Sequence, residues 1–253
     1  NTSSVNRFQG NTIGADSSGS VPISNQTGIF IGFGACNNMV GGSSAGMGNL
    51  ISGNTNDGVF IQNSNSVGNQ VLGNRIGTNR SGTSALPNDY GLVVIEARET
   101  IIGGADLSTP WVCDGPCNLI SGNNEFGIMN QGLPAGGEPT PGTVDTGTKV
   151  LGNFIGTDLS GTSAIPNLAG VDLSYQTGGN IVGGSSTLGE GNLLSGNQID
   201  GVVIRDAWAN DNQVSGNHIG TTVDGNTALS NGETGVKLYG GASGNLVGGE
   251  SAG

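Results

Sequence analysis

Three aspartates are the residues of this sequence best placed for acid–base chemistry. Hydrolysis of a glycosidic bond needs two carboxyl groups about 5 to 10 Å apart. Asp172 occupies an outward position of one strand repeat, and Asp200 and Asp206 flank the next repeat. A lyase would need a base and bound calcium, and Arg205 and Lys237 lie near Asp172 without an accompanying cluster of acids. Scattered acids on an acidic surface explain the same residues, so we predict no catalytic site, with Asp172, Asp200 and Asp206 as the best alternative.

Two cysteines could form a local crosslink. Cys113 and Cys117 flank Asp-Gly-Pro, a turn sequence that brings two thiols together. We predict a disulfide, with two reduced thiols as the alternative, and a disulfide implies an oxidising, extracellular setting. Cys36 lies two coils away, too far for easy bridging. A zinc site built on the three cysteines lacks an evident fourth ligand, so no metal site is predicted.

A single bound calcium ion stays open as a prediction, although no cofactor is expected. Asp158 and Asp224 sit in a connection of constant length, but at different offsets within it. The glycine-rich nonapeptide of calcium-bound β-rolls is absent from the sequence. A fold that depends on calcium is therefore not indicated.

Composition separates this chain from ordinary globular proteins and excludes several partners. Of 253 residues, 50 are glycine, and only 10% are charged, against about 25% in typical proteins. The net charge of −12 disfavours nucleic acid and anionic membranes, and also a polyanion such as pectate or alginate unless calcium bridges the two. No stretch reaches the ~18 apolar residues of a membrane span, so no membrane insertion is predicted.

Three short phrases recur along the chain and determine the expected fold. Gly-Asn-x-Ile-Gly begins at Gly10, Gly73, Gly152 and Gly216. Asn-Leu-(Ile/Leu)-Ser-Gly-Asn begins at Asn49, Asn118 and Asn192. Gly-apolar-x-apolar begins at Gly28, Gly58, Gly91, Gly127, Gly170, Gly201 and Gly235, and only Asn130 breaks its apolar end.

Each phrase alternates apolar and other residues over a few positions, which is the strand signal. Glycine and asparagine at the ends of these runs tolerate left-handed backbone and suit sharp corners. Units of this size cannot bury their apolar face alone, but stacked units can, with the corner asparagines forming amide ladders. We predict an all-β, right-handed parallel β-helix of about seven three-strand coils, with two alternating coil types. A β-propeller or β-sandwich is the alternative, and its longer, aromatic-rich strands do not fit the 4% aromatic content.

Phrases such as Asn49-Leu50-Ile51-Ser52-Gly53-Asn54 and Gly73-Asn74-Arg75-Ile76-Gly77-Thr78 resemble those of bacterial secreted parallel β-helix repeat proteins, a group that includes pectate-lyase-like and NosD-type repeats. The resemblance covers nearly the whole chain. It implies a secreted solenoid, but the group includes lyases, hydrolases, epimerases, adhesins and structural stalks.

Departures from the repeat are the candidate places for added function. Two insertions, near 105–117 and 132–148, are expected to protrude from the middle of the rod as tolerated loops or as binding loops. An outward apolar stripe suggests contact with a partner, a flat sugar face or a covering loop, for which the 132–148 insertion is the simplest candidate. The stripe consists of Phe30, Phe60, Val93, Ile95 and Met129.

We predict one β-helix domain over residues 1–253, uncapped at both ends. Bare β-helix ends expose unpaired strand edges, so end-to-end or lateral self-association is expected. The leading interpretation is a non-enzymatic, extracellular or cell-surface structural or adhesive protein, which forms a fibre or part of a larger surface protein. The alternative is a polysaccharide-active lyase, hydrolase or epimerase, or a carbohydrate-binding module, with a glycan as the partner.

Overall fold

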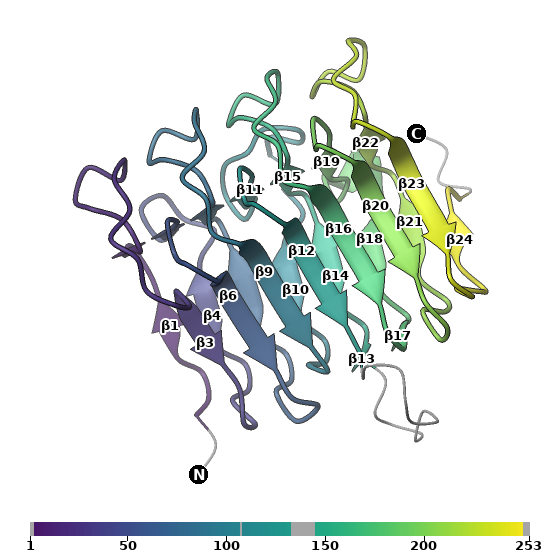
Figure 1. The fold of residues 1–253 in the computed structure, drawn as a ribbon, viewed down its shortest axis with the longest axis horizontal. Coiled ribbons are helices and arrows are strands. Elements are labelled where there is room, and N and C mark those ends of the chain that lie inside the picture. Colours follow the sequence, from purple (N-terminus) through teal and green to yellow (C-terminus); the bar gives the residue numbers. More distant parts are fainter. Residues whose placement is uncertain (1–2, 107, 133–144, 250–253) are drawn as a thin grey trace.

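A computed structural model of the chain describes residues 3–106, 108–132 and 145–249. These residues form β-strands and one short 3-10 helix, η1 (Ser186–Leu188). The strands align in three parallel sheets that run along a rod, and the chain visits the sheets in turn (Figure 1). Each circuit is one coil, so the predicted right-handed parallel β-helix is confirmed. Part of the predicted insertion near 132–148 lies outside the described residues.

The three large sheets are named here in the order in which the chain enters them. The first sheet contains β1 (Arg7–Phe8), β4 (Met39–Gly41), β7 (Gln70–Leu72), β10 (Ile101–Gly103), β14 (Lys149–Leu151), β18 (Ile181–Gly183), β21 (Gln213–Ser215) and β24 (Leu246–Val247). The second contains β2 (Thr12–Ile13), β5 (Leu50–Ile51), β8 (Arg75–Ile76), β11 (Leu119–Ile120), β15 (Phe154–Ile155), β19 (Leu193–Leu194) and β22 (His218–Ile219). The third contains β3 (Ile29–Ile31), β6 (Asp57–Gln62), β9 (Tyr90–Ile95), β12 (Phe126–Gln131), β16 (Ala169–Ser174), β20 (Asp200–Arg205) and β23 (Thr234–Tyr239). A small pair joins β13 (Asp145–Thr146) to β17 (Thr177–Gly178).

The core is a column of aliphatic side chains from all three sheets. In the first sheet Val40, Val71 and Ile102 are partners in adjacent strands, and all three are fully buried. Alternation along each strand turns every second residue inward. Stacking like on like then buries a face that one coil could not bury alone.

Glycine is required where the backbones of neighbouring coils approach closely. Gly41 has a φ of 86°, and a Cβ there would lie 1.9 Å from the carbonyl oxygen of Leu72 in the next coil. At Gly48 a Cβ would lie 1.8 Å from the carbonyl oxygen of Gly73. The repeated glycines therefore set the contact distance between coils, because no other residue fits.

Two uninterrupted asparagine ladders join the coils at their corners. In each, the side-chain amide of one asparagine donates to the side-chain oxygen of the next at 2.9 to 3.1 Å. The first ladder, between the first and second sheets, consists of Asn11, Asn49, Asn74, Asn118, Asn153, Asn192 and Asn217. The second ladder, at the entry to the third sheet, consists of Asn25, Asn54, Asn88, Asn123, Asn167, Asn197 and Asn231. The predicted amide ladders are confirmed.

A third ladder, at the entry to the first sheet, is interrupted in the middle of the rod. Its rungs are asparagines on either side, but Thr100 and Thr148 occupy two positions between them. Asn130 points inward from β12 and donates to the side-chain oxygen of Asn180 at 3.2 Å. The one polar residue at an apolar position of the repeat thus supplies the amide that Thr148 lacks.

Four long connections lie side by side along one edge of the rod and form what we call the loop ridge (Figure 1). They comprise residues 14–25, 77–88, 156–167 and 220–231, and they occur in every second coil. The backbone amides of Arg80, Leu159 and Val223 donate to glycine carbonyls of the preceding connection at 2.9 to 3.1 Å. The two predicted coil types therefore differ in whether they contribute to this ridge.

We predict that Asn153→Ala lowers the free energy of unfolding by about 2 to 4 kcal/mol, because it leaves buried amide donors of Asn118 without an acceptor. Urea denaturation followed by circular dichroism measures the change. The matched control is Asn124→Ala, since Asn124 is exposed and its side chain donates a hydrogen bond to Asp89 at the surface. Equal effects of the two substitutions would contradict a supporting role for the ladder.

Candidate functional site

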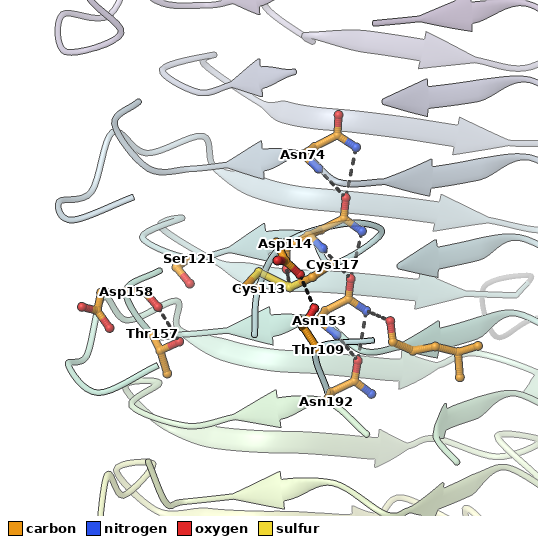
Figure 2. Close-up of a disulfide and its surroundings, with 12 residues drawn as sticks. Asn74, Thr109, Cys113, Asp114, Cys117, Ser121, Asn153, Thr157, Asp158 and Asn192 are labelled. Atoms are coloured by element: carbon orange, nitrogen blue, oxygen red, sulfur yellow. Dashed lines mark hydrogen bonds between the residues drawn. A yellow bond between two sulfur atoms is a disulfide. The ribbon is translucent and has the colours of Figure 1, made fainter. Parts of the chain in front are cut away.

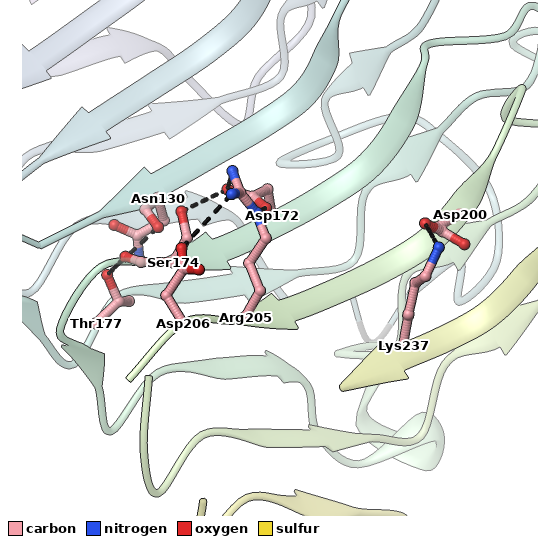
Figure 3. Close-up of polar contacts among 8 residues, drawn as sticks. All are labelled: Asn130, Asp172, Ser174, Thr177, Asp200, Arg205, Asp206 and Lys237. Atoms are coloured by element: carbon pink, nitrogen blue, oxygen red, sulfur yellow. Dashed lines mark hydrogen bonds and ion pairs between the residues drawn. The ribbon is translucent and has the colours of Figure 1, made fainter. Parts of the chain in front are cut away.

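Asp172 lies on the outer face of the third sheet but is closed to solvent. Its side chain is 0% exposed, and Arg205 donates to it from Nε at 2.6 Å and from Nη2 at 3.3 Å (Figure 3). The hydroxyl of Ser174 donates to the second carboxylate oxygen at 2.7 Å. Burial raises the pKa of Asp172, and the hydrogen bonds from Arg205 and Ser174 oppose that rise. Because both oxygens are engaged, the carboxylate is not presented to a substrate.

The structure separates the other two aspartates. Asp206 lies 3.5 Å from Nη1 of Arg205, so it shares this cation with Asp172. Asp200 lies at the other end of β20, where Lys237 approaches it to 3.2 Å (Figure 3). Val203 is the register partner of Asp172, so Asp200 is three residues, about 10 Å, further along the strand. The three aspartates therefore do not face one cleft.

The predicted apolar stripe lies on the same sheet and is only partly exposed. Phe30, Phe60, Val93 and Met129 are register partners in adjacent strands, as the repeat predicts. Phe30 is 45% exposed, whereas Val93 is 3% exposed. Ile95 lies one row further along the strands, beside Gln62 and Gln131. The stripe consequently offers exposed aromatic surface only at its first coils.

The insertion at 105–117, of which all but residue 107 are described, is a strap closed by a disulfide. The sulfur atoms of Cys113 and Cys117 are bonded, with 5.1 Å between the Cα atoms (Figure 2). Cys36 is a free, half-buried thiol. Within the strap, the hydroxyl of Thr109 donates to the carboxylate of Asp114 at 2.8 Å.

The disulfide strap covers an apolar row on the outer face of the second sheet. Leu119, Phe154 and Leu193 are register partners, and they form a buried cluster with Cys117. Trp111 reaches the next strand, β22, where it stacks on His218, with ring centroids 3.8 Å apart and planes 7° apart. The strap therefore spans four strands, and the only histidine of the chain serves as a packing surface for it.

An open groove of about 420 Å³ begins where the strap ends. Its floor is the outer face of the second sheet at Leu50, Arg75 and Leu119, where the two leucines are buried and Arg75 is half-buried. The loop ridge forms one wall through Arg80 and Leu159. The volume lies within the range of about 300 to 1,000 Å³ typical of small-ligand sites.

The opposite wall comes from two connections between the first and second sheets. One contributes Ser44, Ala45 and Gly46, and the other is the strap, which contributes Cys113 and Asp114. The groove is therefore assembled from coils that lie apart in the sequence. Its lining combines apolar side chains with two arginines and one aspartate, and a few such polar groups can fix the orientation of a ligand.

The two arginines of the groove are held by neutral groups rather than by carboxylates. Arg75 donates from Nη1 to the carbonyl oxygen of Arg80. Arg80 donates from Nη2 to the hydroxyl of Thr12 at 2.8 Å and to the carbonyl oxygen of Ser17 at 3.2 Å. Within the described part of the chain, the ion pairs involve Arg205 and Lys237. Burial, and then the charge of Arg80, lower the pKa of Arg75.

Sequence reasoning did not single out this pair, although the repeat carried a signal. In a later coil of the same type, the positions of Arg75 and Arg80 are occupied by Phe154 and Leu159. These two residues pack together in the apolar cluster under the strap. A change from two apolar residues to two cations within one coil is a local departure from the repeat. The sequence alone does not show that these two cations line a groove, because other coils supply the walls of the groove.

The aspartates considered for calcium serve as turn caps in the loop ridge. Oδ1 of Asp158 accepts backbone amides of Thr162 and Ser163 at 3.0 and 3.1 Å, and Asp224 is bound similarly. In the first connection, hydrogen bonds from the Ser20 amide and the Ser18 hydroxyl, together with others, lower the pKa of Asp16 to about 2. No group of three or more potential metal ligands occurs among the described residues.

Comparison with known proteins supports the fold alone. No family model matches the chain, and no curated protein matches it. A solved structure of a periplasmic alginate epimerase, AlgG, aligns with a TM-score of 0.52 and 14% identity over 87% of this chain. The chain spans about half of that structure, 48% of its length. A plasmid-mediated fluoroquinolone resistance protein aligns with a TM-score of only 0.18. The described residues contain no helix long and apolar enough to cross a membrane.

Asp172→Asn is expected to lower the free energy of unfolding by about 2 to 4 kcal/mol, because it removes the close, fully buried carboxylate partner of Arg205 and leaves only the more distant Asp206. Asp200→Asn is the matched control, since its partner Lys237 is 38% exposed and the pair is worth about 1 kcal/mol or less. Thermal and urea denaturation report both. A stable Asp172→Asn protein that loses turnover of a glycan would instead restore a catalytic role.

Proposed function

We propose that the protein is an extracellular, non-catalytic β-helix of the adhesive type, which binds carbohydrate in the groove beside the disulfide strap. The groove carries this proposal. It is the place on the described surface where apolar side chains, guanidinium groups and a carboxylate converge on an open volume of about 420 Å³. The half-buried side chain of Leu159 suits the apolar face of a sugar ring, and the surrounding polar groups suit its hydroxyl groups.

The setting of the site supports a secreted carbohydrate binder. The strap that borders the groove is closed by a disulfide, and such bonds persist in oxidising compartments. The alginate epimerase that shares the fold acts, by its title, on a polysaccharide in the periplasm. At 14% identity that likeness is one of architecture, so it favours carbohydrate as a ligand class without assigning a reaction.

The charges of the third sheet support binding over catalysis. Asp172 and Asp206 share Arg205, and Asp200 is paired with Lys237 at the far end of the strand. A general acid and its partner carboxylate must both reach the same bond. Asp172 is fully buried against Arg205, and Asp200 lies with a different cation at the other end of the strand, so these carboxylates do not meet this requirement.

A substitution that fills the groove tests the proposal. Ala45→Trp places a large ring in the groove from an exposed position of its wall. Binding to the glycans that the native protein retains on an array should fall at least about 10-fold, because the ring occupies the space of a sugar. Isothermal titration calorimetry with the best glycan measures the change.

The control is Asn65→Trp, which adds the same ring at an exposed position outside the groove lining. Glycans incubated with the native protein should be recovered intact by mass spectrometry. Unchanged affinity in Ala45→Trp would move the site elsewhere, and released fragments or altered sugars would favour the enzymatic alternative.

A further inference from the structure

One coil of the rod brings two arginines together where equivalent coils do not. The position of Arg75 on the second sheet is occupied by threonine, phenylalanine and histidine in the other coils of the same type. The position of Arg80 in the loop ridge is occupied by Ser17, Leu159 and Val223. The strand and the ridge can therefore be built without either charge, so the two arginines are not needed for the fold.

The arrangement of these arginines is unfavourable in the absence of an anion. Both side chains line the same groove, and Arg75 is half-buried there. None of the carboxylates that the structure describes forms an ion pair with either of them. Like charges that are partly removed from water repel one another, and an anion between them relieves both the repulsion and the loss of hydration.

Hydrogen bonds to backbone carbonyl oxygens and to one hydroxyl hold Arg75 and Arg80 in place for such an anion. Nη1 of Arg75 is bound by the carbonyl oxygen of Arg80, and Arg80 is bound by Thr12 and by carbonyl groups of the preceding connection. These contacts use part of each guanidinium fork. The remaining N–H groups can donate to a carboxylate or sulfate, for which the planar fork is well suited.

The charge of the rest of the molecule limits how many anionic groups the ligand carries. The chain has 19 acidic residues and 7 basic residues, so its net charge is −12. A long polyanion would extend beyond the two arginines onto an acidic surface and be repelled. A mostly neutral glycan with one anionic group would place that group at the arginines and leave neutral sugars elsewhere.

We infer that the groove recognises a glycan that carries an isolated anionic substituent, a carboxylate or a sulfate ester, and that Arg75 and Arg80 bind this group. The inference rests on the proposed function, because it specifies the ligand class of the same groove. Asp114 lies on the strap wall, and its carboxylate can accept a hydrogen bond from a neighbouring sugar hydroxyl.

The experiment compares four glycans of one length: a neutral oligosaccharide, the same oligosaccharide with a single sulfate ester, the same with a single uronate, and a uniformly charged polyuronate. Calorimetry gives the affinity of the native protein for each. A singly charged glycan should bind about 10- to 100-fold more tightly than the neutral one, since hydrogen bonds to charged groups are the strong ones. The preferred member of the two singly charged glycans identifies the anion.

Three variants test the two arginines. Arg80→Gln removes an exposed cation, and Arg75→Gln removes the half-buried one. Each should abolish the preference for the charged glycan, whereas Arg75→Lys should restore only part of it, because an ammonium group lacks the fork. Arg7→Gln, at an exposed position outside the groove lining, is the matched control and should leave the preference unchanged. Circular dichroism and thermal unfolding establish that each variant is folded.

The outcomes separate this inference from the proposed function. If the neutral glycan binds as tightly as the charged ones and neither arginine substitution matters, the anionic ligand class is wrong and the carbohydrate groove stands. If the polyuronate binds most tightly, the inference of an isolated charge is wrong. If no glycan binds to the native protein, both the inference and the proposed function are wrong.

Discussion

Stacking of one asparagine amide on another, at every coil, is the interaction on which the rest of this structure depends. Each rung both donates to the next asparagine and accepts from the one before, so a corner must recur at the same place in every coil. Glycine at neighbouring positions keeps the backbones close enough for these bonds. Because the corners are fixed, variation in length is confined to the connections between them. A solenoid of this kind can acquire new sites only in its connections and on its outward faces.

The groove follows directly from that constraint. Its floor is a set of short strands whose positions the ladders determine, so Leu50, Arg75 and Leu119 lie on a rigid surface. Its walls are connections, namely the loop ridge on one side and the strap with a shorter connection on the other. A disulfide between Cys113 and Cys117 closes the one wall that the regular repeat does not supply. The site is therefore variable in its walls and fixed in its floor, as preorganised binding requires.

The sequence allowed the fold, the register and the ladders to be predicted, because each of these repeats and each copy supports the others. Burial on the outward faces could not be predicted in the same way. The register placed Arg205 near Asp172, but not the 2.6 Å contact that removes Asp172 from solvent. The strap was recognised as an insertion, yet the stacking of Trp111 on His218 joins residues more than 100 positions apart. The groove depends on such contacts between non-repeating segments, and periodicity carries no information about them.

The distribution of charge distinguishes the two outward faces and explains why the groove is the stronger candidate. On the third sheet, cations and carboxylates are paired within the chain, so Asp172 and Asp200 are already compensated. On the second sheet, Arg75 and Arg80 are held by carbonyl and hydroxyl oxygens, which position a guanidinium without neutralising it. A protein with a net charge of −12 has many carboxylates that could neutralise two cations. Since none of the described carboxylates pairs with them, the compensating anion is expected to come from outside the chain.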